Sequence, residues 1–216
     1  MAQQVEFKKV RDFGEVIGDT FLFIKQNFKP LLKTFVYFCG FFMLAGMIST
    51  IILQINTLVD SNAYVGTNNF QVNYFHQLGD HYIEFLFTML IGMLFFNSLS
   101  VSVLGYIAAY IQKGNVVPTT TEVWGYYKYY FFRFFGISIV TSLFMGLCFV
   151  CCVIPGIYVF PAMTILYPVV IVENAGLGGA FDRSFKLIKN EWWITAAIIL
   201  VVWIITYFAS AIIRIP

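Results

Sequence analysis

Long apolar stretches alternate with short polar segments along the chain, and this alternation predicts an all-α membrane protein. A helix needs about 20 mostly apolar residues to cross a bilayer. Five stretches approach or exceed this length, at residues of about 31–55, 82–112, 134–153, 157–172 and 194–213. We therefore expect a polytopic transmembrane helix bundle over residues 30–216, preceded by a separate N-terminal segment.

The N-terminal segment, residues 1–29, predicts an amphipathic helix that lies along the membrane surface. Its apolar residues recur at steps of three and four positions, while charged residues fill the other faces. The alternative is a soluble helix packed on a partner. Pro30 suits the first position of a new helix, so the first span is expected to start there.

Two further amphipathic helices are predicted between the spans. Thr119 and Glu122 have the spacing of a capping box, and they precede a short segment, residues 123–133, that is crowded with aromatic side chains. Aromatic rings with polar tips favour the headgroup region of a bilayer. The segment from Glu173 to Asn190 has apolar residues on one face and charges on the others.

The remaining connections differ in character. Residues 56–81 are rich in Asn and contain no Lys or Arg, which predicts an external loop. Pro155 and Gly156 predict a sharp turn between the third and fourth spans. Pro161 and Pro168, inside the fourth span, should bend it.

Charge fixes the expected orientation. The chain is 60% hydrophobic and only 11% charged, whereas about a quarter of the residues in soluble domains are charged. With five spans, twelve of the 13 Lys and Arg residues fall on one side of the membrane, and Arg214 alone falls on the other. Because Lys and Arg concentrate in cytoplasmic loops, the N-terminus is predicted to be cytoplasmic.

The sequence offers no constellation for catalysis or for binding a metal or cofactor. His76 and His81 lack further ligands at suitable spacing. Cys148, Cys151 and Cys152 lie among apolar residues, as expected of small packing side chains. A disulfide between Cys148 and Cys151 remains an open alternative if that end of the span meets an oxidising compartment. We expect no enzymatic activity.

Polar residues inside the second span allow two interpretations. Asn97, Ser98, Ser100 and Ser102 lie in its middle, where such side chains usually hydrogen-bond to neighbouring helices. A path for a small solute is the alternative. At the cytoplasmic end of the fourth span, Glu173 is expected to be solvated and able to pair with a nearby cation, either Arg183 or Lys186.

Several short motifs in the C-terminal half follow one another in a recognisable order. They are Pro155-Gly156-Ile157-Tyr158, Tyr167-Pro168, Val172-Glu173-Asn174, Gly179-Ala180-Phe181, Arg183-Ser184-Phe185-Lys186-Leu187 and Trp192-Trp193. This order resembles a broad family of bacterial membrane domains, which occur alone or as the membrane region of glycerophosphodiester phosphodiesterases. The resemblance implies a six-helix domain in the bacterial cytoplasmic membrane, in agreement with a sixth span that we expect beyond Pro216. It implies no catalysis, because the phosphodiesterase activity belongs to a separate soluble domain.

These observations predict a non-enzymatic membrane module that binds lipid or other membrane proteins, or a subunit of a membrane complex. The expected contacts are cations and interfacial tryptophans: Lys128, Arg133, Arg183, Lys186, Lys189, Trp192 and Trp193. Nucleic acid is not an expected partner, because the aromatic helix carries too few cations. A small-solute transporter or channel is the alternative function.

Overall fold

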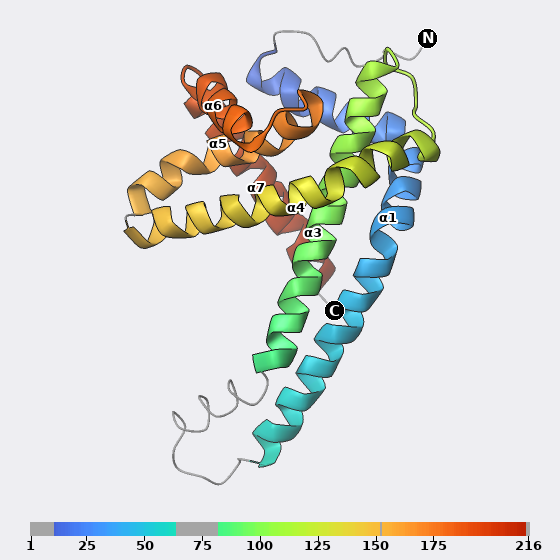
Figure 1. Ribbon diagram of the computed structural model, residues 1–216, viewed down its shortest axis with the longest axis vertical. Coiled ribbons are helices and arrows are strands. Elements are labelled where there is room, and N and C mark those ends of the chain that lie inside the picture. The colour runs from blue at the N-terminus through green and yellow to red at the C-terminus, as the bar shows by residue number, and fades with distance from the viewer. Residues whose placement is uncertain (1–10, 64–81, 152, 215–216) are drawn as a thin grey trace.

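The computed structural model describes residues 11–63, 82–151 and 153–214, and these parts of the chain form six α-helices and no strand. The helices are α1 (Phe13–Ala63), α3 (Tyr82–Gln112), α4 (Thr120–Cys151), α5 (Val153–Val172), α6 (Leu177–Ile188) and α7 (Trp192–Arg214) (Figure 1). All except α6 are long and apolar enough to cross a membrane. The predicted all-α, multi-pass membrane fold is therefore confirmed.

Helices α1 and α3 run side by side in opposite directions and form the longest part of the molecule (Figure 1). Polar side chains join them in the lower part of this pair. The hydroxyls of Ser49 and Thr88 are 2.7 Å apart, and the amide of Asn56 donates to both carboxylate oxygens of Glu84 at 3.0 and 3.1 Å. The bounds of α3 agree with those predicted for the second span.

The prediction that Pro30 opens a new helix is wrong, because Pro30 lies inside the 51-residue α1. Contacts with α3 hold the segment before this proline in place. Phe23 packs edge-on against Tyr106 and Tyr110, and the Tyr106 hydroxyl donates to the Asn27 side chain at 3.0 Å. A proline inside a helix bends it, and the N-terminal part of α1 lies at an angle to the long part that follows (Figure 1).

Helix α4 is also longer than predicted. The predicted short aromatic helix, residues 123–133, continues without a break into the predicted third span, and the combined helix ends at Cys151. Its buried residues recur at steps of three and four, so a single face packs without interruption: Val123, Tyr127, Tyr130, Phe134, Ile137 and Thr141. One of the two hydrogen bonds of the predicted capping box is present at its start, because the Thr119 N–H donates to the Glu122 carboxylate at 2.8 Å.

The turn between α4 and α5 falls earlier than predicted. Helix α4 ends at Cys151 and α5 begins at Val153, so Pro155 and Gly156 lie in the first turn of α5. Proline is tolerated there because the N–H groups of a first helical turn have no intrahelical partner. Glycine is needed for close approach, since a Cβ on Gly156 would lie 2.7 Å from a ring carbon of Phe149.

The external loop predicted over residues 56–81 starts later than predicted. Its first residues belong to α1, which continues to Ala63 because Asn56 and Glu84 extend the α1–α3 pairing. The rest of the loop, residues 64–81, lies outside the described residues, as do His76 and His81.

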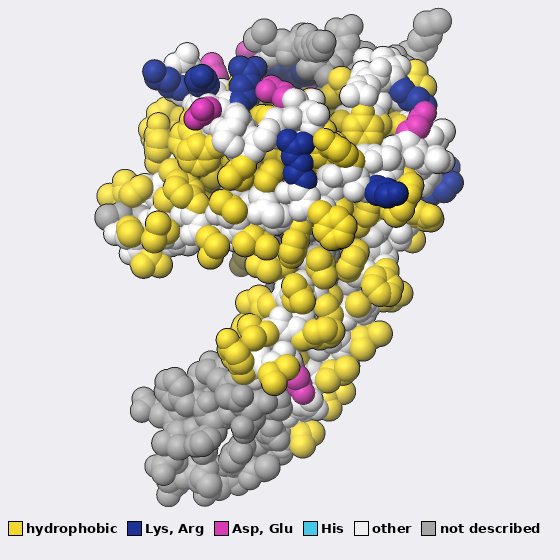
Figure 2. All heavy atoms as spheres, in the orientation of Figure 1, with side chains coloured by type: hydrophobic (Ala, Val, Ile, Leu, Met, Phe, Trp, Pro, Cys, Tyr) yellow, Lys and Arg dark blue, Asp and Glu magenta, His cyan; other side chains and the backbone are white. Residues whose placement is uncertain are grey.

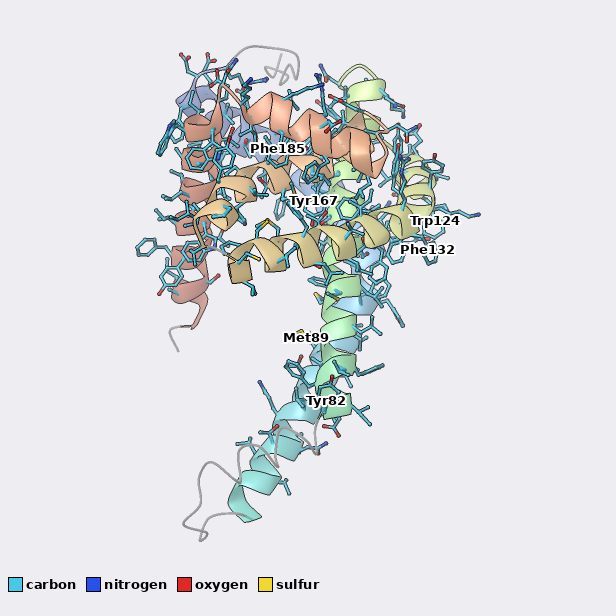
Figure 3. The ribbon with its side chains drawn as sticks, turned by 60° about the vertical axis from the view of Figure 1, so that its left-hand side comes forward. Tyr82, Met89, Trp124, Phe132, Tyr167 and Phe185 are labelled. Carbon is cyan, nitrogen blue, oxygen red and sulfur yellow. The ribbon has the colours of Figure 1, made fainter. Side chains whose placement is uncertain are left out.

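Helices α4 and α5 form an antiparallel hairpin that crosses the α1–α3 pair, and both ribbon views agree on this arrangement (Figures 1 and 3). Phe134 of α4 meets Tyr167 of α5, with ring centroids 5.0 Å apart. Helix α6 packs on the hairpin, and α7 descends beside it (Figure 1). The described core lies where the hairpin crosses the α1–α3 pair, and it includes fully buried Tyr106, Phe134 and Leu166.

Replacing Gly156 with Val should destabilise the hairpin, because the added atoms would overlap the Phe149 ring. We expect the free energy of unfolding to fall by about 1–3 kcal/mol. Gly136→Val is the matched control, since a Cβ there meets nothing within 4 Å. Denaturant unfolding in detergent micelles would measure both. Equal losses for the two variants would contradict the proposed role of the close approach.

Candidate functional site

Lys and Arg side chains gather at one end of the molecule. Figure 2 shows them on the upper part of the visible face, whereas hydrophobic side chains cover most of the described surface below. Three of the predicted contact residues are exposed and form no ion pair with another described residue: Lys128 of α4, and Lys186 and Lys189 at the end of α6. We call these three residues the lysine surface.

The two predicted arginines have structural partners instead. Arg133 donates to the side-chain oxygen of Asn174 at 2.8 Å and lies over the ring of Tyr130. Asn174 has a positive φ of 51°, so this contact holds an unusual backbone turn between α5 and α6. The Arg183 Nε donates to the Glu173 carboxylate at 3.2 Å. The sequence left open whether Glu173 pairs with Arg183 or Lys186, and the structure shows Arg183.

Trp192 and Trp193 also differ from each other. The Trp192 indole N–H donates to the carbonyl oxygen of Tyr158 at 2.9 Å, and its ring stacks on the Tyr158 ring with centroids 5.8 Å apart. Trp193 is 81% exposed. Trp192 therefore fixes the start of α7 on α5, whereas Trp193 is free to contact the surroundings.

Three of the four polar residues inside α3 are buried: Asn97, Ser98 and Ser102. Ser98 donates to the carbonyl oxygen of Phe38 in α1 at 2.9 Å, so its own oxygen is left to accept from the Tyr127 hydroxyl of α4, also at 2.9 Å. The thiol of Cys39 lies 3.5 Å from Ser98 Oγ and 3.6 Å from Ser102 Oγ. The predicted role in helix–helix hydrogen bonding is confirmed for Ser98.

Asn97 has a less complete set of partners. Its amide nitrogen donates to the carbonyl oxygen of Phe131 in α4 at 3.2 Å. Its side-chain oxygen is buried and has no hydrogen-bond partner among the described residues. The sequence identified Asn97 as polar at membrane depth, but it contained no signal for this unpaired acceptor, because the pairing depends on how α4 crosses α3.

Two apolar grooves open toward the outside of the helices and were not expected from the sequence. One, of about 450 Å³, lies in the corner between α3 and α4 and includes Met89, Phe96 and Phe135. The other, of about 560 Å³, lies between α5 and α7, and Ala196 and Ala197 form part of its wall. In a membrane, such grooves are surfaces for acyl chains or for apolar helices.

The described parts of the chain contain no cluster of three or more metal-binding side chains. Cys148 and Cys151 are free, so the alternative of a disulfide between them is not realised. Comparison with protein-family models, curated proteins and solved structures gives no match for this chain.

The Ser98–Tyr127 hydrogen bond should contribute measurably to stability. Such bonds between membrane helices contribute about 0.5–2 kcal/mol. Ser98→Ala and Tyr127→Phe should each cost that much, and the double variant should cost less than their sum because both remove the same bond. Denaturant unfolding in micelles would measure the free energy of unfolding of the two single variants and the double variant. Tyr129→Phe, at a 62% exposed position, serves as the control. If the loss of stability in the double variant equalled the sum of the two single losses, the hydrogen bond would be contradicted.

Trp192→Ala should destabilise the protein by about 1–3 kcal/mol, because it removes ring stacking and a hydrogen bond to α5. Trp193→Ala should change the free energy of unfolding by less than about 0.5 kcal/mol, because its ring is exposed. The two neighbouring positions are matched in residue type, and the same unfolding measurement tests both. A larger loss at Trp193 would contradict the assignment.

Proposed function

We propose that this protein is a non-enzymatic membrane module whose lysine surface binds anionic lipid headgroups. The observation that supports it most directly is the exposure of Lys128, Lys186 and Lys189 at one end of a chain whose other exposed surface is mainly apolar. Cations close to an anionic membrane surface are attracted to it by about 1 kcal/mol each. Trp193, which is 81% exposed and follows Lys189 by four residues, suits the same interface.

This function would place the lysine surface and the N-terminus on the cytoplasmic side. The segregation of twelve of 13 cations supports that orientation. The resemblance to the membrane region of glycerophosphodiester phosphodiesterases supports a location in the bacterial inner membrane. It also supports a role without catalysis, in which the module acts through lipid or as a subunit with other membrane proteins.

A small-solute transporter or channel is the second candidate, and the unpaired side-chain oxygen of Asn97 is the observation that favours it. Asn97, Ser98 and Ser102 are each no more than 1% exposed, however. Ser98 also joins α3 to both neighbouring helices. This packing favours a structural role for the polar residues over a solute path.

Neutralising the lysine surface should weaken lipid binding. We expect each single Lys→Gln change at Lys128, Lys186 or Lys189 to weaken affinity for an anionic phospholipid by about fivefold, and the triple variant by about a hundredfold. Titration of a fluorescent anionic phospholipid into the micelle-bound protein would measure this, with a zwitterionic phospholipid as the reference.

Lys113→Gln is the matched control. The Lys113 ammonium lies 2.7 Å from the Glu122 carboxylate, so its charge is already neutralised locally. Its effect should be smaller than that of any lysine in the lysine surface. Unchanged affinity in the triple variant would rule out the proposed headgroup site, and retained co-purification of another membrane protein would then favour the subunit role.

A further inference from the structure

The packing of α6 on the α4–α5 hairpin bears on how the hairpin sits in a membrane. Both α4 and α5 are long and apolar enough to cross one. We propose that they do not cross it, and that the hairpin enters from the side that carries α6 and returns to that same side. Helices α1, α3 and α7 are then the ones that cross, and the hairpin and α6 form a platform in one leaflet.

The first contact that supports this proposal joins the start of α7 to the part of α5 near the hairpin tip. Trp192, four residues after the end of α6, donates to the Tyr158 carbonyl and stacks on the Tyr158 ring. Tyr158 precedes Val172, the end of α5 nearest α6 in sequence, by 14 positions. At 1.5 Å per residue, it lies about 21 Å along the helix from that end.

A second contact, from α6 itself, reaches a similar depth along the hairpin. Phe181 of α6 meets Phe144 of α4, with ring centroids 5.5 Å apart. Phe134, ten residues earlier in α4, is the residue that meets Tyr167 of α5. Phe144 therefore lies about 15 Å farther toward the hairpin tip than the Phe134–Tyr167 contact.

These contacts are incompatible with an upright hairpin. If α5 crossed the membrane with Val172 at the surface, Phe181 and Trp192 would both lie about 20 Å inside a hydrocarbon core that is about 30 Å thick. The segment between them carries the exposed charges of Lys186 and Lys189. Ionised side chains at such depth are costly. A hairpin that lies along the surface keeps these charges in the headgroup region.

The crossing of α3 by α4 places the hairpin at a compatible depth. The Asn97 amide of α3 donates to the Phe131 carbonyl oxygen of α4. Glu84 lies near the first residue of α3, at the end of this helix farther from α6, and precedes Asn97 by 13 residues. That separation is about 20 Å of an approximately 30 Å core, so the crossing point falls in the half nearer α6. Met89 and Tyr82 lie on the part of α3 beyond the hairpin (Figure 3).

The tip of the hairpin is suited to an acyl-chain environment. Val150 is 86% exposed and Ile154 is 82% exposed, one on each side of the connection between α4 and α5. Residues 143–160 contain no Asp, Glu, Lys or Arg. The surroundings that fit this tip are therefore the acyl chains of one leaflet, and the partner of the platform is the lipid layer itself.

The depth of Cys151, the last residue of α4, tests the proposal. A chain with Cys39, Cys148 and Cys152 replaced by Ser keeps Cys151 as its single thiol, which takes a fluorophore. Two references carry the fluorophore at Lys189→Cys and Tyr82→Cys in a chain without other cysteines. All three are reconstituted into vesicles of one orientation, with the Lys189 face outward. A spin-labelled phospholipid that quenches the fluorophore is then added to the outer leaflet only.

A hairpin in one leaflet predicts that the Cys151 probe loses most of its fluorescence, as the Lys189→Cys probe does. The Tyr82→Cys probe should be quenched little, which also verifies the orientation. Quenching of Cys151 closer to that of the Tyr82→Cys probe would overturn the proposal and establish a crossing hairpin. The quenching does not depend on headgroup affinity. The hairpin proposal can therefore be wrong while the lipid-binding proposal is right, and the lipid-binding proposal can be wrong while the hairpin proposal is right.

Discussion

The contact between α4 and α3 is the interaction on which the rest of the structure depends. Gly105 of α3 lets the two helices approach closely, since a Cβ there would lie 3.2 Å from the Tyr126 Cβ. Along the same seam, Ser98 joins Phe38 of α1 to Tyr127 of α4 through one hydroxyl group. Three helices therefore share one buried hydrogen-bonded junction, and the direction of α4 across α3 sets where α5, α6 and α7 can lie.

The same junction explains why the cations at this end divide into two kinds. Arg133 lies on the α4 helix that the junction positions, and it holds Asn174 in the turn that leads to α6. Arg183 reaches back to Glu173 at the same turn. These two arginines fix α6 on the hairpin, and by doing so they leave Lys186 and Lys189 exposed at its end. A bidentate, planar guanidinium suits the first task, whereas a mobile ammonium suits contact with lipid headgroups.

The sequence predicts local features better than it predicts the joining of elements. The bounds of α3 could be predicted because an apolar run ends at polar residues on both sides, and the capping box at Thr119 could be predicted because it depends on neighbours in sequence. Pro30 was misleading because Tyr106 and Tyr110, about 80 positions away, hold the segment before the proline against α3. The sequence identified seven candidate contact residues, but only tertiary contacts separate the engaged arginines and Trp192 from the exposed lysines.

Charge patterning has a limit that this chain makes clear. Two consecutive crossings with an uncharged connection leave every cation on the same side as a hairpin that never crosses, so the twelve-to-one distribution is equally compatible with three or five spans. Length and composition do not separate these arrangements either, since α4 and α5 satisfy both criteria. What separates them is a contact between a charged segment and an apolar helix far from the end that would lie at the membrane surface. Here the contacts of Phe181 with Phe144 and of Trp192 with Tyr158 supply that information, because the charged segment between Phe181 and Trp192 is held at both ends and restricts how deeply the hairpin can be inserted.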